Sequence, residues 1–206
     1  MPFLTPDVYF PHITDIPGSF FKERGIRLMI LDVDNTLTSH NNPTPFPGIP
    51  EWIEERKGEG LTPVILSNNT PERVAPFAEL IGLPFVANAA KPLTFGITRA
   101  LKRYGMRAEE TCLIGDQLFT DILGGNLKPG VTSVLVTPWE KETHGFLAVK
   151  RKWEAPILRR YFGTEKYFCT KAGFSFIMKE EKRHRSVRKG KRIDHTFRPR
   201  RYGGQL

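Results

Sequence analysis

Cysteine is scarce in this chain, and long apolar segments are missing from it. The 206 residues include two cysteines, Cys112 and Cys169, which are too few for a disulfide framework and suit a reducing cytoplasm. No apolar run approaches the ~20 residues that a membrane-spanning helix needs. The first residues also lack the basic start and the apolar stretch of a secretory signal. We therefore expect a soluble, cytoplasmic protein in which Cys112, inside an apolar segment, is a buried thiol.

Acidic residues are rare toward the C-terminal end. Residues 150–206 hold 18 Lys and Arg against 5 Asp and Glu, so this segment carries +13 and the rest of the chain −4. We expect a globular domain over residues 1–162 and a basic, partly disordered extension over 163–206, with a hairpin at 167–178 and disorder at 179–201. Clustered Lys and Arg bind the phosphates of RNA and of anionic lipids alike. A lipid surface, a nucleic acid and a merely solubilising role for the extension are equally compatible with this composition.

Short apolar segments alternate with segments of helical periodicity across the first 162 residues. Such alternation indicates an α/β fold with a doubly wound parallel sheet. The first 27 residues show no clear period, and we expect them to pack beside the sheet as a lead-in. The pattern predicts strands at 27–31, 61–66, 83–87, 111–114 and 131–136, and helices at 51–57, 71–81, 93–104, just before 124–126, and at 151–162. In the last helix we expect an apolar side formed by Trp153, Ile157 and Tyr161, with Pro156 in its first turns.

Two carboxylates follow the most apolar of these strands. Residues 28–37 read Leu-Met-Ile-Leu-Asp-Val-Asp-Asn-Thr-Leu, and an unbroken apolar run is typical of a strand buried on both faces. Asp32 and Asp34 are two residues apart and would project to the same side of an extended backbone. Like charges at this spacing repel each other unless a cation or a shared proton neutralises them. The stretch therefore indicates a metal and phosphate site, although a polar turn closing the strand is the simpler alternative.

Three further strand ends carry polar side chains that could join this site. They are Ser67 with Asn68, Lys91, and Asp116 with Asp121. In a right-handed parallel sheet these loops fall on the same side, where ligands bind. Each residue alone has an ordinary explanation: Ser67 as a helix cap, Lys91 as a surface lysine, and Asp121 as an acid in a helix's first turn. Their joint occurrence favours a site in which carboxylates hold Mg²⁺ and the lysine and serine bind phosphate. The five histidines show no ligand spacing.

The order of these residues resembles the four motifs of the haloacid dehalogenase (HAD) superfamily. Leu-Asp-Val-Asp-Asn-Thr-Leu, Leu-Ser-Asn-Asn, Ala-Lys-Pro and Ile-Gly-Asp-Gln-Leu-Phe-Thr-Asp-Ile-Leu-Gly-Gly-Asn are similar to the YqeG-type phosphatases of HAD subfamily IIIA, over about residues 3–162. The resemblance implies a HAD-like fold and a Mg²⁺-dependent phosphomonoesterase. It also implies that Asp32 is the nucleophile and that Asp34 is the acid and base. Mg²⁺ would be held by Asp32, by Asp116 and by the backbone carbonyl of Asp34. Phosphate would be bound by Ser67, Asn68 and Lys91, and Asp121 would orient Lys91 or a metal-bound water.

The intervals between these motifs are short. Residues 38–63 and 70–90 hold a loop and one helix each, which leaves no room for a sizeable cap domain. An uncapped site is open to large substrates or to substrates presented at a surface. YqeG-type relatives include phosphatidylglycerophosphate phosphatases, so the resemblance makes that membrane lipid headgroup the preferred substrate. With that substrate, the cytoplasmic location expected from the scarce cysteines could extend to a peripheral position at the membrane surface. The alternative is a protein that binds nucleic acid or ribosomes, with a core that acts on nucleotide ends or serves as a scaffold.

Overall fold

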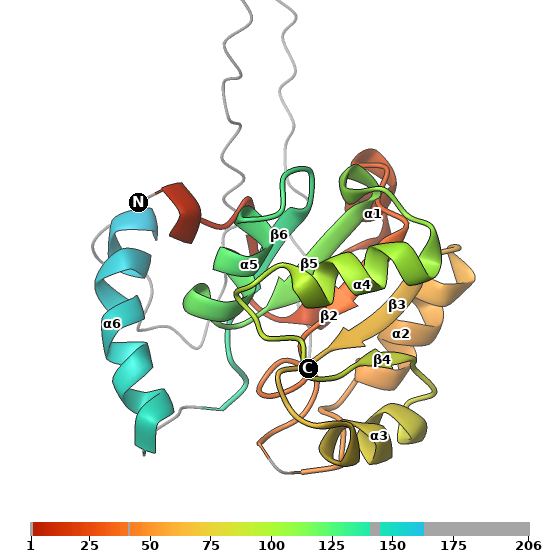
Figure 1. Ribbon diagram of the computed structural model, residues 1–206, viewed down its shortest axis with the longest axis horizontal. Coiled ribbons are helices and arrows are strands. Elements are labelled where there is room, and N and C mark those ends of the chain that lie inside the picture. The colour runs from red at the N-terminus through yellow and green to blue at the C-terminus, as the bar shows by residue number, and fades with distance from the viewer. Residues whose placement is uncertain (1, 41, 141–144, 163–206) are drawn as a thin grey trace, which may run out of the picture.

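The computed structural model describes residues 2–40, 42–140 and 145–162. Cys169, the expected hairpin at 167–178 and the basic segment at 179–201 lie outside the described residues. Among the described helices, none combines the length and the apolar character needed to cross a membrane. Figure 1 shows a single sheet with helices on its two faces, which is the predicted α/β class.

Six parallel strands form this sheet in the order β1-β6-β5-β2-β3-β4. Their bounds are β1 Val8–Phe10, β2 Leu28–Leu31, β3 Thr62–Leu66, β4 Phe85–Val86, β5 Thr111–Gly115 and β6 Thr132–Val136. Strand β2 lies at the centre, where Leu28 pairs with Thr62 of β3 on one side and with Thr111 of β5 on the other. All four residues of β2 are buried, which confirms the interpretation of the apolar run.

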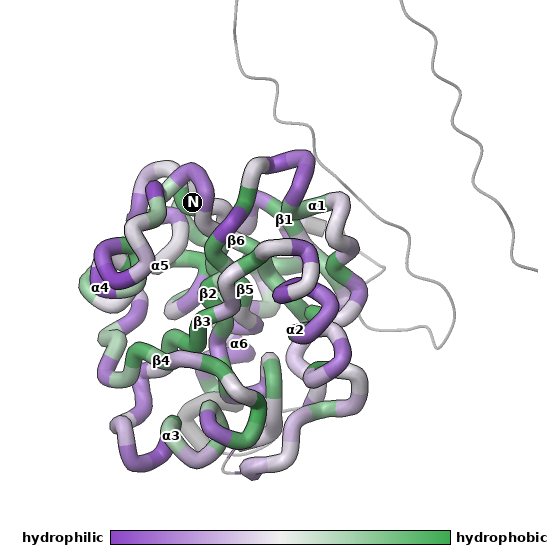
Figure 2. The backbone as a smooth tube through the Cα atoms, turned by 90° about the vertical axis from the view of Figure 1, so that its right-hand side faces the viewer, coloured by the Kyte–Doolittle hydropathy of each residue, from purple (hydrophilic) through white to green (hydrophobic). Residues whose placement is uncertain are grey.

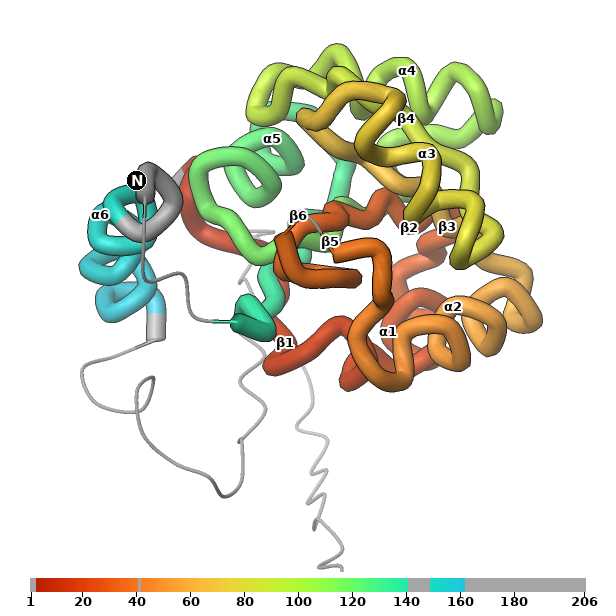
Figure 3. The backbone as a smooth tube through the Cα atoms, turned by 90° about the horizontal axis from the view of Figure 1, so that it is seen from below, coloured from red at the N-terminus to blue at the C-terminus, as the bar shows by residue number. Residues whose placement is uncertain are grey.

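Alternate residues of each strand pack against different helices. Met29 and Leu31 face α1 (Gly18–Glu23), α2 (Ile49–Gly58) and α3 (Pro71–Leu80), whereas Leu28 and Ile30 face α4 (Phe95–Tyr104). Helix α5 (Leu123–Asn126) lies on the α4 side, and Figure 3 shows the sheet between α4 and α5 on one side and α1 and α2 on the other. In Figure 2 the apolar colour follows the strands through the middle of the molecule. The apolar runs of the sequence therefore form the centre of a doubly wound fold.

The lead-in differs from the prediction, because it contributes a strand. Strand β1 pairs with β6 through Val8 and Val134, and Asp7 reinforces this edge by accepting hydrogen bonds from the backbone N–H and the hydroxyl of Ser133. Three residues are too few to show a strand period, and the partner lies 126 positions away. Short 3₁₀-helices occupy Pro2–Leu4, Ile13–Asp15 and Ala108–Glu110.

The last helix also differs from the prediction. Helix α6 (Gly145–Phe162) begins before Arg151 and contains Pro156 in its interior. Trp153 is 69% exposed, whereas its neighbour Glu154 is 1% exposed, so the expected apolar side is rotated by about one residue. Ile157 and Leu158 do pack against the body, next to β6 and the helix that follows β5. The rotation has a polar cause, because the carboxylate of Glu154 accepts a hydrogen bond from a backbone N–H inside the body.

The remaining elements match their predicted positions to within about two residues, and the intervals between the motifs are short as expected. Among the described residues, a loop and α2 separate β2 from β3, and α3 separates β3 from β4. No cap domain stands in these two intervals of the described chain. The carboxyl edge of the sheet is therefore not covered by an inserted domain.

Candidate active site

Asp32 comes directly after β2 and stays inside the protein. Its backbone N–H donates to the carbonyl of Ile114 on β5 at 2.9 Å, which continues the pairing of the two strands by one residue. The chain then turns at Asn35, whose φ of 62° is unusual for a residue other than glycine. The backbone N–H of Asn35 donates to the carbonyl of Thr38 at 2.6 Å and closes this turn. The turn leaves Asp32 6% exposed at the carboxyl edge of the sheet.

Lys91 reaches the same place from the loop after β4. The side chain of Asn68 fixes its backbone, accepting from the Lys91 N–H at 2.7 Å and donating to the Lys91 carbonyl at 3.0 Å. The Lys91 ammonium group then lies 2.5 Å from Asp32 Oδ1 and 2.6 Å from Asp121 Oδ1. The structure thus places Lys91 in a buried ion-pair network, and the interpretation as a surface lysine is wrong.

Asp116 and Asp121 belong to the segment after β5. A π-helical turn, Leu118–Ile122, carries Asp121 back against the end of the strand, where its Oδ2 accepts from the Gln117 N–H at 3.1 Å. Gly115 permits this close approach, because a Cβ at that position would lie 2.4 Å from Asp121 Cγ. Asp116 is 2% exposed, and its Oδ1 accepts a 3.5 Å hydrogen bond from the Thr36 hydroxyl.

Three buried carboxylates are gathered at this edge. Asp32, Asp116 and Asp121 each offer an oxygen atom within 4.8 Å of the others. Hard divalent cations such as Mg²⁺ prefer carboxylate and carbonyl oxygen ligands, so this donor set fits such an ion. The carboxylate of Asp34 is not part of this cluster, and the contribution of its backbone carbonyl to the metal site stays a prediction.

The electrostatics of the cluster favour bound positive charge. Burial raises the pKa of the Asp32 carboxyl group well above its ordinary value; Lys91 opposes this shift, whereas Asp121 and Asp116 add to it. Burial alone would lower the pKa of Lys91, but the carboxylates of Asp121 and Asp32 outweigh it and raise that pKa. Neighbouring carboxylates contribute to both shifts, because buried carboxylates repel each other until a proton or a cation neutralises them.

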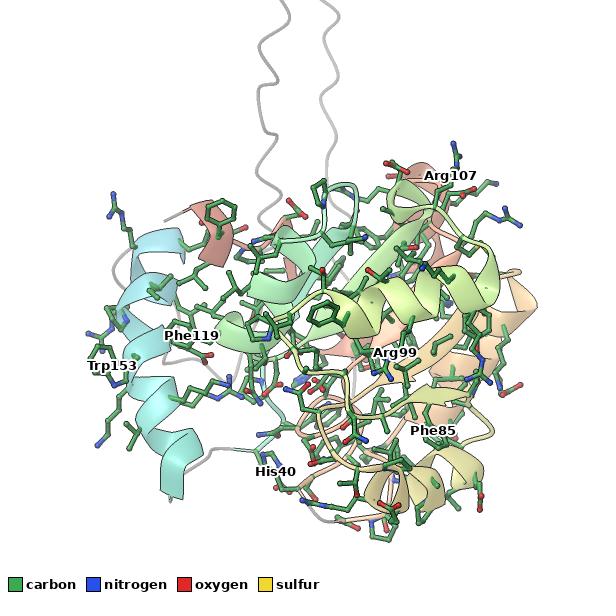
Figure 4. All side chains as sticks on the ribbon, in the orientation of Figure 1. His40, Phe85, Arg99, Arg107, Phe119 and Trp153 are labelled. Carbon is green, nitrogen blue, oxygen red and sulfur yellow. The ribbon has the colours of Figure 1, made fainter. Side chains whose placement is uncertain are left out.

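Asp34 has different neighbours. Its Oδ2 accepts from Asn69 Nδ2 at 2.8 Å, and its Oδ1 lies 3.3 Å from Nδ1 of His40. Figure 4 shows His40 at the lower end of the molecule, on the loop that follows β2. No histidine is among the predicted site residues, because a single His in a proline-rich loop offers no spacing signal. Asn69 could have been suspected, since it follows Ser67 and Asn68 at the end of β3.

Ser67 is buried at the end of β3. Its hydroxyl oxygen accepts from the Asn69 N–H at 3.1 Å, and the cap of α3 is Thr70. The explanation of Ser67 as a helix cap is therefore wrong. Ser67, Asn68 and Lys91 lie on adjacent loops, as expected for one site, and their roles in phosphate binding stay predictions.

Helix α6 adds a contact that the sequence analysis missed. The guanidinium of Arg151 forms an ion pair with the Asp116 carboxylate and donates to the Asp116 carbonyl at 2.7 Å. Glu154 holds this arginine through a 2.8 Å ion pair, and its other oxygen accepts from the Leu118 N–H at 2.9 Å. Arg151 and Glu154 are three positions apart on one helix, a spacing that permits the two side chains to pair. This spacing does not predict the contact of Arg151 with Asp116.

Comparison with known proteins identifies the same family as the sequence motifs do. The model of the haloacid dehalogenase-like hydrolases matches residues 40–127. Over 156 residues the chain is 40% identical to the probable phosphatase YqeG of Bacillus subtilis, covering 76% of this chain and 90% of that protein.

Two weaker similarities accompany this match. Phosphatidylglycerophosphate phosphatase 1, chloroplastic/mitochondrial, of Arabidopsis thaliana is 25% identical over 169 residues, 77% of this chain and 48% of that protein. A Legionella pneumophila structure described as a HAD subfamily III A hydrolase is 18% identical, with a TM-score of 0.40 over 47% of this chain and 58% of that one. Because the identity to the Bacillus subtilis protein spans most of both chains, this chain belongs to the YqeG-type phosphatases of the haloacid dehalogenase superfamily.

Proposed function

We propose that this chain is a Mg²⁺-dependent phosphomonoesterase that works through an aspartyl-phosphate on Asp32. The observation that carries the proposal is the convergence of the carboxylates of Asp32, Asp116 and Asp121, two of which, Asp32 and Asp121, pair with the Lys91 ammonium group. When bound, Mg²⁺ would be held by Asp32, the Asp34 carbonyl and Asp116, and it would supply the charge neutralisation that lets a carboxylate approach a phosphate dianion.

The residues of the site can carry both halves of the hydrolysis. A carboxylate oxygen of Asp32 attacks phosphorus, and the bond from phosphorus to the alcohol oxygen breaks. Asp34 donates a proton to the departing oxygen, then accepts one from the water that attacks the aspartyl-phosphate and releases inorganic phosphate. Lys91, the Ser67 hydroxyl and the Asn68 N–H bind the phosphate oxygens during both steps. Asp121 keeps Lys91 oriented through its 2.6 Å ion pair.

The substrate that we propose is phosphatidylglycerophosphate. Its support is the name of the relative from Arabidopsis thaliana, together with a sheet edge that no inserted domain covers in the described chain. An uncovered edge suits a headgroup that projects from a membrane. We further propose that the basic residues beyond 162 hold the enzyme at an anionic surface.

A screen of phosphate release with Mg²⁺ tests the proposal. The enzyme is expected to hydrolyse phosphatidylglycerophosphate in mixed micelles faster than sugar phosphates or nucleotide ends, and to lose activity in EDTA. Asp34→Asn should abolish turnover while the circular dichroism spectrum stays unchanged, because the amide can still bond Asn69 but cannot transfer the proton. A preference for a soluble metabolite would refute the lipid substrate alone. Wild-type turnover by Asp34→Asn would refute the assigned acid and base.

A further inference from the structure

Helix α6 contacts the segment that follows β5 at the carboxyl edge of the sheet. Arg151 pairs with the carboxylate of Asp116, which is 2% exposed and belongs to the acidic cluster. One turn further along the same side of α6, the carboxylate of Glu154 accepts a hydrogen bond from the Leu118 N–H at 2.9 Å. A helix that lies outside the four motifs therefore contacts a predicted metal ligand directly.

Arg151 contacts Asp116 at two points. Its Nη2 donates to Oδ2 of the Asp116 carboxylate, and its Nη1 donates to the backbone carbonyl of the same residue at 2.7 Å. The guanidinium group is a rigid planar fork, so these contacts fix the side chain of Asp116 relative to its own backbone. Glu154 in turn holds the fork, because its Oε2 lies 2.8 Å from Arg151 Nη1. The orientation of the Asp116 carboxylate is thus determined from α6.

The two oxygen atoms of the Asp116 carboxylate have different neighbours. Oδ2 contacts Arg151, whereas Oδ1 accepts a 3.5 Å hydrogen bond from the hydroxyl of Thr36. Thr36 belongs to the turn after β2, which also carries Asp32, so Oδ1 lies on the side of the cluster where Asp32 is found. A carboxylate can bind a metal ion through one oxygen and accept a hydrogen bond through the other. A cation between Asp32 and Asp116 therefore does not have to displace Arg151.

We propose that Arg151 is a positioning residue that holds the Asp116 carboxylate in the orientation in which it binds Mg²⁺. The inference rests on the proposed Mg²⁺-dependent function and adds to it a residue from outside the motifs. Hydrogen-bond partners of metal ligands fix the orientation of those ligands, and removing them typically weakens metal binding by roughly 10–100-fold. Arg151 pairs with both Asp116 and Glu154, so its removal would also leave these two carboxylates without their shared cation.

Calorimetric titration of Mg²⁺ into the metal-free full chain tests this proposal. Arg151→Gln should raise the Kd for Mg²⁺ by about tenfold, because the Asp116 carboxylate is no longer held. Arg151→Lys should recover part of the loss, since an ammonium group keeps the charge but not the planar fork. With p-nitrophenyl phosphate as substrate, the Mg²⁺ concentration that gives half-maximal turnover should rise by a similar factor. At saturating Mg²⁺, kcat should stay within about threefold of wild type.

Two variants of α6 are matched controls. Lys150→Gln removes a positive charge from the neighbouring residue, whose Nζ donates to the side chain of Gln117 at 2.8 Å. Tyr161→Phe removes the 3.0 Å hydrogen bond from its hydroxyl to the Pro6 carbonyl, which attaches α6 to the body away from the acidic cluster. Both variants should bind Mg²⁺ with the Kd of the wild type.

An unchanged Kd in Arg151→Gln would overturn the assignment, and a lower Kd would mean that Arg151 competes with the metal for Asp116. Equal weakening in Tyr161→Phe would show that Arg151 acts only by attaching the helix. If Arg151→Gln does not fold, Arg151→Lys carries the test, because a wild-type Kd in that variant would also overturn the assignment. A wild type that binds no Mg²⁺ would contradict the proposed function itself, which is a different result.

Discussion

Asp32 is the residue at which folding and function conflict most directly. Its carboxylate is buried next to Asp116 and Asp121, and Lys91 supplies the nearest compensating charge. A carboxylate that is to attack phosphorus must be ionised, yet burial favours its protonated form. In the proposed mechanism Asp32 must therefore be ionised although its surroundings raise its pKa, a conflict that is common at catalytic sites.

This conflict predicts opposite effects of Asp32→Asn on activity and stability. Activity should fall by more than about 10³-fold, because an amide cannot attack phosphorus. The folded state holds its Asp32 proton to higher pH than the unfolded chain does, so wild-type stability decreases as pH rises above ~4 toward the folded pKa. Without this loss, the variant should be more stable at pH 7 by about 0.5–2 kcal/mol in urea unfolding with EDTA present.

The control for this experiment is Glu23→Gln, an exposed acid of α1, which should change neither property. A variant less stable than wild type at pH 7 in EDTA would contradict the account of Asp32. The greater stability of the variant should also shrink as the pH is lowered toward ~4, because the Asp32 carboxyl group of the wild type then becomes protonated in the unfolded chain as well as in the folded protein.

Among the secondary-structure elements, α6 links the last described residues of the chain to the carboxyl edge of the sheet, where Arg151 contacts Asp116. It lies beside the sheet at the β1–β6 end in Figures 1 and 3, and its buried side carries a carboxylate instead of an uninterrupted apolar stripe. Glu154 satisfies the Leu118 N–H at the start of the π-helical turn and holds Arg151 on Asp116. Since that turn carries Asp121, the helix supports the segment that positions two carboxylates of the cluster.

Glu154→Ala should therefore destabilise the protein by about 1–3 kcal/mol, because it leaves the buried Leu118 N–H without an acceptor. The urea midpoint measures this effect. Lys152→Ala on the exposed side of the same helix should stay within about 0.5 kcal/mol of wild type and controls for helix propensity. Equal midpoints for the two variants would show that the Glu154 bond contributes nothing to stability.

At the scale of the whole molecule, charge is divided unevenly along the chain. Residues 150–206 carry +13 against −4 for the remainder, and the catalytic residues proposed here all precede residue 163. In the proposed function, catalysis and attraction to an anionic partner thus depend on different parts of the sequence. The basic segment can therefore be deleted without removing any of the proposed catalytic residues.

Deleting residues 179–206 should leave turnover of a small soluble phosphoester nearly unchanged. Binding to anionic vesicles or to RNA should weaken, since each Lys or Arg near an anionic lipid surface contributes about 1 kcal/mol. Sedimentation with vesicles and gel shifts with RNA, each over a range of salt, measure the change, and competition between the two ranks them. If the truncated protein bound both as well as the full chain, the extension would have only a solubilising role.

Local patterns in the sequence were enough to predict the fold class, five of the six strands and the motif residues of the candidate site. These are local properties. The apolar run 28–31 predicts a buried strand, and the carboxyl ends of parallel strands meet at one edge of the sheet for any conformation of the loops. The order Asp32, Ser67, Lys91, Asp116 therefore specified a site before any contact was known. Even the burial of Cys112 follows from its apolar neighbours.

Features that depend on partners far apart in the chain could not be predicted from the sequence. Strand β1 exists because β6 pairs with it across more than 120 residues, and three residues carry no period of their own. Helix α6 is turned so that Glu154 instead of Trp153 faces inward, because an unpaired N–H at Leu118 needs an acceptor. The contacts of His40 with Asp34 and of Arg151 with Asp116 have the same origin. Side-chain contacts across a fold depend on distances that spacing along the sequence does not encode.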